Sequence, residues 1–180
     1  ATDARGLDVI RHSTAHVMAD AVQKLFPGTK VTIGPAIEDG FYYDIDMEPV
    51  SKEHFDKIEA EIKRIISAKI PFKRKEVSKD DALDFYKNEP YKLELISDLK
   101  DGTISLYEQG DFTDLCRGPH LPHTGFIKAI KLMKVSGAYW RADQTKAQLQ
   151  RIYGTAFFSK KELDDHLHFI EEAIKRNHRR

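Results

Sequence analysis

The chain of 180 residues has the length of one ordinary domain or of two small ones. Hydrophobic residues make up 41% and charged residues 32% of it, which is typical of a globular protein and excludes a disordered or fibrous chain. Lys plus Arg and Asp plus Glu number 29 each, so the net charge gives no chain-wide attraction to nucleic acids or membranes. Any contact with nucleic acid must therefore be local.

The cysteine content and the ends of the chain indicate its compartment. Cys116 is the single cysteine, so no internal disulfide can form, and we expect a reducing, cytoplasmic compartment. No stretch approaches the roughly 20 apolar residues that a membrane helix needs, so no membrane partner is expected. The chain lacks an initiator Met and ends within a helical pattern, which suggests a fragment of a longer parent.

Helices are expected where apolar residues recur every three or four positions. This spacing predicts a first helix over 8–26 and a second that follows the N-cap Ser51 and ends near residue 71. Ser78 starts a third helix that ends at Pro90, and the capping box of Ser159 and Glu162 starts a last helix that runs to the end of the chain.

Strands are predicted from runs of β-forming residues between turn signals, at 30–33, 40–46, 72–77, 91–95, 104–108, 112–115, 127–135 and 149–153. The mixed order of elements favours an α+β fold, with a mostly antiparallel sheet and packed helices. We expect 1–158 to form one domain, with a smaller β-α-β-α lobe over about 29–90. The helix at 159–180 would lead toward a further domain.

Two pairs of potential ligand side chains stand out. His12 and His16 lie four residues apart, so both project from one face of the first helix. Cys116 and His120 lie in a segment whose glycine and proline predict a tight loop. Taken alone, two histidines at this spacing are more often a surface pair. A single cysteine is more often a small buried hydrophobic residue. Together the four residues, called the His/Cys cluster below, suit either zinc or a metal-free hydrolytic site.

A basic segment covers residues 126–151, where six basic residues face one acidic residue, for a local net charge of +5. Tyr139 and Trp140 are interleaved with these charges. Lys and Arg can follow phosphates while bases stack on aromatic rings, but a charge run is commonly just a solvated face. Both interpretations stay open for the four side chains that we call the basic stripe: Lys128, Lys131, Lys134 and Arg141.

Several sequence strings resemble the editing domain of bacterial-type threonyl-tRNA synthetases, and they span nearly the whole chain. They are HSTAH at 12–16, IGP at 33–35, GFYYD at 40–44, DLCRGPH at 114–120, KLMK at 131–134, GAYWR at 137–141 and LQRIYGTA at 149–156. The His and Cys/His pairs also occur in alanyl-tRNA synthetase editing domains. CRGPH and LQRIYGTA are typical of the threonyl type.

The resemblance implies hydrolysis of mischarged seryl-tRNA(Thr) to serine and tRNA(Thr). It implies catalytic roles for the His/Cys cluster and Lys92, with His16 or His120 activating the water and Lys92 stabilising negative charge. Tyr43 and Asp114 would bind the substrate, and the basic stripe would contact tRNA(Thr). Without the resemblance, Lys92 and Asp114 would be an ordinary salt-bridged pair.

The resemblance also bears on cofactors and on the parent enzyme. Editing is expected to need no metal, because four protein ligands would leave no open position for water, while zinc at the His/Cys cluster stays an open alternative. The parent would ligate threonine to tRNA(Thr) with ATP, magnesium and a separate zinc in another domain, as a homodimer, whereas the fragment alone can be a monomer. Two alternatives are a free-standing trans-editing deacylase and a non-catalytic, zinc-stabilised RNA-binding module.

Overall fold

The computed structural model describes residues 4–100 and 102–178, and every strand pair within these ranges is antiparallel. This confirms the expected α+β fold. In chain order the helices and strands are α1 (Ala4–Leu25), β1 (Lys30–Val31), β2 (Ala36–Ile37), β3 (Gly40–Asp46), α2 (Phe55–Ser67), β4 (Lys73–Ser78), α3 (Lys79–Phe85), α4 (Pro90–Asp98), β5 (Thr103–Gln109), β6 (Phe112–Leu115), β7 (Ala129–Tyr139), β8 (Gln148–Phe157) and α5 (Lys160–His178).

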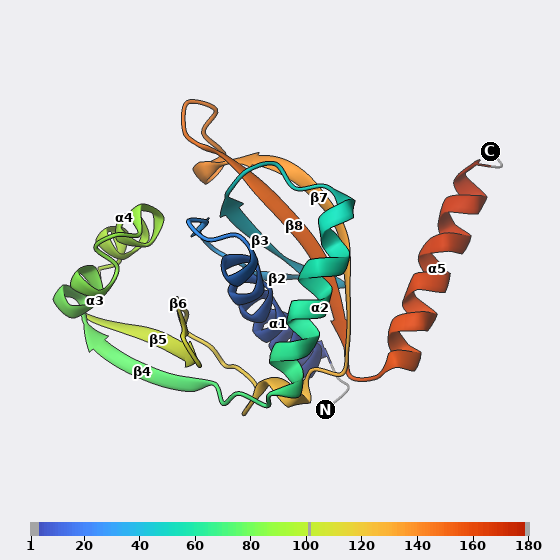
Figure 1. The fold of residues 1–180 in the computed structure, drawn as a ribbon, viewed down its shortest axis with the longest axis horizontal. Helices are drawn as coiled ribbons and strands as arrows, with labels where there is room; N and C mark the ends of the chain where they lie inside the picture. Colours follow the sequence, from blue (N-terminus) through green and yellow to red (C-terminus); the bar gives the residue numbers. More distant parts are fainter. Residues whose placement is uncertain (1–3, 101, 179–180) are drawn as a thin grey trace.

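The larger sheet has the order β1-β3-β8-β7, with β2 pairing on β3, and it carries the main core together with α1 and α2 (Figure 1). On α2, Ile58, Ile62 and Ile65 are fully buried, at the spacing of one helix face. Burying each such side chain stabilises the fold by roughly 1.5–3 kcal/mol. The apolar periodicity of α1 and α2 therefore determines how they cover the sheet.

The smaller sheet has the order β4-β5-β6 and packs with α3 and α4, at the left of Figure 1. The predicted N-cap of α3 is confirmed, because the Ser78 hydroxyl accepts a hydrogen bond from the Asp81 amide at 3.0 Å. The segment of about 29–90, expected as a smaller lobe, contributes β1 and β3 to the larger sheet and β4 to the smaller one.

The strand predicted at 91–95 is wrong, because these residues belong to helix α4. Pro90 occupies the first turn of that helix, where its missing N–H and fixed φ are favourable. Lys92 and Ile96 are both buried and lie four residues apart on one helix face. Because lysine counts as a polar residue in a sequence pattern, residues 91–95 alternate between apolar and polar types in a way that fits a strand as well as a helix.

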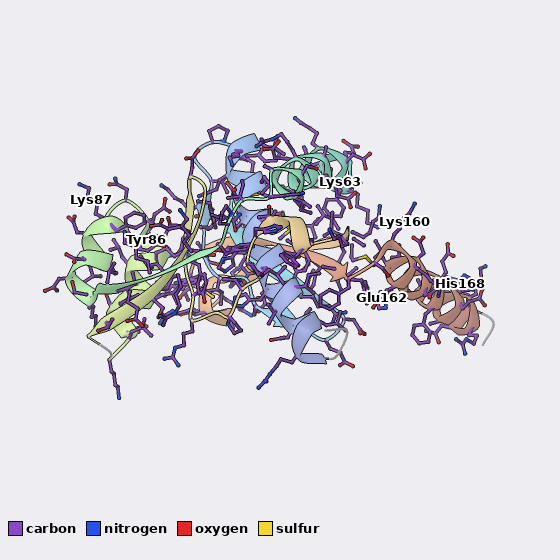
Figure 2. All side chains as sticks on the ribbon, turned by 90° about the horizontal axis from the view of Figure 1, so that it is seen from below. Lys63, Tyr86, Lys87, Lys160, Glu162 and His168 are labelled. Carbon is purple, nitrogen blue, oxygen red and sulfur yellow. The ribbon has the colours of Figure 1, made fainter. Side chains whose placement is uncertain are left out.

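Helix α5 projects away from the two sheets and begins at the predicted cap, where the Ser159 hydroxyl accepts from the Glu162 amide at 3.2 Å (Figure 1). Figure 2 shows Lys160, Glu162 and His168 along this helix at one end of the molecule. Among the described residues of α5, Leu163 alone is buried. No described helix is both long and apolar enough to cross a membrane.

Candidate active site

The four residues of the His/Cys cluster meet beside the middle of α1. His12 and His16 project from α1, while Cys116 and His120 come from the loop that follows β6. One ligand atom from each residue lies within 4.8 Å of the others. The Cys116 Sγ is 3.4 Å from His12 Nε2, and the ring centroids of His16 and His120 are 4.3 Å apart. Helix spacing and the loop together bring both pairs to one place.

The loop after β6 is shaped by close contacts of its own. Gly118 has a φ of +78°, and a Cβ at this position would come 2.2 Å from the Tyr107 hydroxyl, so only glycine fits. Its amide donates to Cys116 Sγ at 3.1 Å. The His120 ring stacks on the Phe72 ring, with 5.2 Å between the ring centroids, and packs edge-on against the Tyr107 ring, with 4.4 Å between the centroids. These contacts fix Cys116 and His120 toward α1.

A buried polar network lies directly behind the cluster. The ammonium group of Lys92, 1% exposed, donates to one carboxylate oxygen of Asp114 and to the Thr32 carbonyl, the latter at 2.6 Å. The other Asp114 oxygen accepts from the Tyr43 hydroxyl at 2.8 Å and lies 3.3 Å from His16 Nε2. The ion pair is therefore joined to the His/Cys cluster through His16.

A pocket of about 210 Å³ opens beside the cluster and is lined by His12, His16, Ile33, Gly34, Pro35, Asp114, Leu115, Cys116 and Arg117. Tyr43, for which the resemblance implies substrate binding, is fully buried, and its hydroxyl donates to Asp114. A Cβ on Gly34 would come 2.1 Å from the Tyr43 ring, so glycine lets this ring pack under the pocket. Lys92 likewise acts behind the pocket and not in its lining.

Burial sets the protonation states at the site. Desolvation lowers the pKa of His16 to about 4, against the opposing effect of Asp114, and lowers the pKa of His120 to about 2 with help from the neighbouring histidines. Desolvation also lowers the pKa of His12 and raises that of the Cys116 thiol to about 11. Near neutral pH the cluster thus contains neutral imidazoles and a thiol.

At Asp114, neighbouring charges and not desolvation decide the direction in which the pKa shifts. Burial alone would raise its pKa, but the charge of Lys92 and the nearby His16 outweigh burial, and the pKa is lowered. The pocket therefore combines an ionised carboxylate with neutral imidazoles, an arrangement that can bind a cationic amino group and accept a proton from water.

Comparison with known proteins identifies the family. Residues 104–153 match the family described as "Threonyl and Alanyl tRNA synthetase second additional domain". The chain is 67% identical to the threonine–tRNA ligase of Desulfosudis oleivorans, 66% to that of Desulfatibacillum aliphaticivorans and 57% to that of Nitratidesulfovibrio vulgaris. These alignments cover 97–99% of this chain and 28% of each relative. The chain therefore contains a domain of this family and is similar over nearly its whole length to one segment of these ligases.

It is an editing-type domain of the threonyl-tRNA synthetase kind, and it spans 28% of the length of these relatives. The resemblance drawn from the sequence strings is thereby confirmed. The family model matches from β5 into β8, so it includes the loop that carries Cys116 and His120.

The His/Cys cluster of this editing-type domain fits zinc in its donor chemistry. Bond lengths of about 2.0–2.3 Å put tetrahedral ligand atoms about 3.3–3.6 Å apart. The largest separation here is 4.8 Å, so a bound ion would draw the four side chains together by about 1 Å. Among the described residues, His120 Nε2 is a buried atom without a hydrogen-bond partner, and it is available to such an ion or to a substrate.

The basic stripe divides into two parts. A bulge between Leu132 and Lys134 places Lys131 opposite Thr155 and Lys134 opposite Tyr153, so the two lysines share one face of β7. Arg141 instead contacts Asp98 at 2.5 Å, and Trp140 is buried. The three lysines are exposed, and of these Lys131 lies 3.8 Å from a Glu59 carboxylate oxygen. Arg141 is held by its carboxylate partner, and the buried Trp140 cannot stack on a base.

Sequence reasoning gave no role to several residues that shape the site. Ser13 contacts His120, Thr32 receives the Lys92 ammonium through its carbonyl, and Phe72 and Tyr107 pack on the His120 ring. Ser13 stands inside the HSTAH string, which was the one available signal. A main-chain carbonyl and ring packing leave no sequence signature.

Proposed function

We propose that this domain hydrolyses the ester bond of mischarged seryl-tRNA(Thr). The observation that carries the proposal is the His/Cys cluster opening on a pocket of about 210 Å³ with an ionised Asp114 in its lining. Serine and threonine differ by one methyl group, which an aminoacylation pocket distinguishes only by roughly 10- to 200-fold. A second, hydrolytic site that disfavours the larger amino acid supplies the missing selectivity.

The reaction needs a water molecule, a base and a group that stabilises negative charge. The water oxygen attacks the ester carbonyl carbon while a neutral imidazole, His16 or His120, takes its proton. The bond to the ribose 3′ oxygen then breaks, and the protonated imidazole returns a proton to that oxygen. Asp114 binds the serine ammonium group, and the charge of Lys92, held behind Asp114, favours the developing oxyanion.

In this proposal the editing step uses protein groups and water without a metal. The Cys116 thiol, with a pKa of about 11, stays protonated and lines the pocket beside His12. Zinc bound by His12, His16, Cys116 and His120 together would stabilise the fold, and it would supply Lewis acidity only with one of these ligands released. The same donor set favours a second candidate, a zinc-stabilised RNA-binding module without hydrolytic activity.

The relatives named threonine–tRNA ligase support a wider proposal for the parent protein. It would join threonine to tRNA(Thr) with ATP and magnesium and use a separate zinc, as a cytoplasmic homodimer. The partner of this domain would be the acceptor end of tRNA(Thr), contacted by the exposed lysines of the basic stripe.

The test is to mix the 180-residue chain with seryl-tRNA(Thr), with and without a chelator, while circular dichroism follows the fold. We expect serine release that survives chelation. Release that stops on chelation and returns with zinc would contradict the metal-free step. An absence of release, together with unfolding on chelation, would favour the RNA-binding module.

A further inference from the structure

Ser13 makes a contact that bears on the chemistry of His120. It lies on α1 between His12 and His16 and is fully buried. Its hydroxyl oxygen is 2.9 Å from His120 Nδ1 and accepts a hydrogen bond from the Leu121 amide at 3.2 Å. The contact spans 107 positions of the chain, so it ties the loop after β6 to α1.

The direction of the bond between Ser13 and His120 follows from counting donors. The Leu121 amide can only donate, so the Ser13 oxygen acts as an acceptor there. The Ser13 proton then needs an acceptor of its own. Within the described ranges, the one remaining partner of the Ser13 hydroxyl is His120 Nδ1. The hydroxyl of the neighbouring Thr14 has a different partner, because it donates to the Ile10 carbonyl at 2.6 Å.

The alternative direction leaves more groups unpaired. If His120 Nδ1 carried the proton and donated to Ser13, the buried Ser13 proton would have no acceptor, and His120 Nε2 would be an unpaired acceptor as well. If Ser13 donates, only the Nε2–H group is unpaired. Leaving one more buried group unpaired corresponds to a preference of roughly 5- to 150-fold for the direction in which Ser13 donates.

We propose that Ser13 holds neutral His120 in the tautomer protonated at Nε2, so that His120 presents an N–H donor, and not an acceptor, to the His/Cys cluster. Ser13 is thus a positioning residue. The Nε2–H group has no acceptor among the described residues, so it can donate to an oxygen of a bound substrate.

The assignment deepens the proposed function and rests on it for its chemical meaning. His120 donates to the carbonyl oxygen that becomes the oxyanion, and it cannot be the base at Nε2. His16 Nε2 lies 3.3 Å from the ionised Asp114, whose negative charge favours the proton of neutral His16 on that nitrogen and leaves Nδ1 as the acceptor. The water proton therefore passes to His16, while its oxygen bonds to the ester carbon.

Nuclear magnetic resonance tests the tautomer without any tRNA. The chain labelled with ¹⁵N in its histidines, with a chelator present and at about pH 8, gives two-bond correlations that show which nitrogen is protonated. His120→Gln identifies the His120 signals by their loss. We expect protonation at Nε2 in the unchanged chain and a shift toward a mixture of both tautomers in Ser13→Ala.

Two further variants control for indirect effects. Thr14→Val removes a neighbouring buried hydroxyl that does not contact His120, and it should leave the His120 pattern unchanged. Ser13→Thr keeps the hydroxyl and should restore the Nε2 pattern. Protonation at Nδ1 in the unchanged chain, or the same pattern in the unchanged chain and Ser13→Ala, would overturn the proposal.

The activity assay then separates this proposal from the function it rests on. Ser13→Ala should hydrolyse seryl-tRNA(Thr) with a lower kcat and an unchanged KM, because substrate binding is left intact. A kcat of Ser13→Ala equal to that of the unchanged chain would overturn the catalytic role given to the Nε2 tautomer. If the unchanged chain shows no hydrolysis, the proposed function fails, while the resonance data still decide whether Ser13 sets the tautomer.

Discussion

Replacing Lys92 with methionine tests the buried ion pair behind the pocket. Lys92 and Asp114 are 1% and 3% exposed, and Asp114 lies within hydrogen-bond distance of Tyr43 and His16. Methionine has a similar length and no charge, so it fills the space of the aliphatic chain and removes the ammonium group. The carboxylate of Asp114 is then left buried without a compensating charge.

The expected cost is large relative to the stability of a domain. Removing one partner of a buried ion pair costs about 3–5 kcal/mol, against a total free energy of unfolding of about 5–15 kcal/mol. For a domain of this size that corresponds to a fall in Tm of about 6–20 °C. The double variant Lys92→Met/Asp114→Asn removes both charges, and it should be less destabilised than Lys92→Met alone.

Urea unfolding followed by circular dichroism measures these differences. Lys161→Met is the matched control, because Lys161 pairs with Asp165 in solvent on α5, and its loss should leave the free energy of unfolding nearly unchanged. The reasoning is refuted if Lys92→Met lowers the free energy of unfolding by less than about 1 kcal/mol. It is also refuted if the double variant loses as much free energy of unfolding as the two single variants lose together.

Three more predictions follow from the charges at the site and on the surface. The pKa of His16 is about 4 in the folded chain and near 6.5 in the unfolded chain, so the unfolded chain binds more protons between these values. Lowering the pH from 7 to 5 should therefore reduce the free energy of unfolding by about 2 kcal/mol through His16. The variant His16→Gln should not show this part of the loss. Added zinc should bind more tightly as the pH rises, since the Cys116 thiol must lose its proton, and calorimetry that detects no proton release would contradict this. Changing the three lysines of the basic stripe to alanine should reduce the salt slope of tRNA binding by about two to three, and an unchanged slope would remove the basic stripe from the interface.

The sequence predicted the main elements of the fold where one face of an element is apolar throughout. α2 and β3 were found because their buried residues follow the period of a helix or a strand. α4 was missed because its buried face includes Lys92, whose ammonium group is satisfied by partners distant in sequence. Local periodicity cannot predict a lysine whose burial depends on Asp114 and the Thr32 carbonyl.

The candidate site was predictable in its residue types but not in its connections. Helix spacing paired His12 with His16, and loop composition placed Cys116 near His120. The sequence did not indicate that Tyr43 would lie beneath the pocket, or that Ser13 would bond to His120. These contacts depend on how α1 packs against the loop after β6, which is a tertiary arrangement that residue spacing does not encode.

The proposed function requires this site to remove serine from tRNA(Thr) in preference to threonine. The most direct measurement compares the single-turnover rate constants for seryl-tRNA(Thr) and threonyl-tRNA(Thr) with the same preparation of the 180-residue chain, using His16→Gln as the inactive control. We expect faster release of serine than of threonine, and loss of that release in the control. Equal rates for the two esters, or serine release that His16→Gln leaves unchanged, would contradict it.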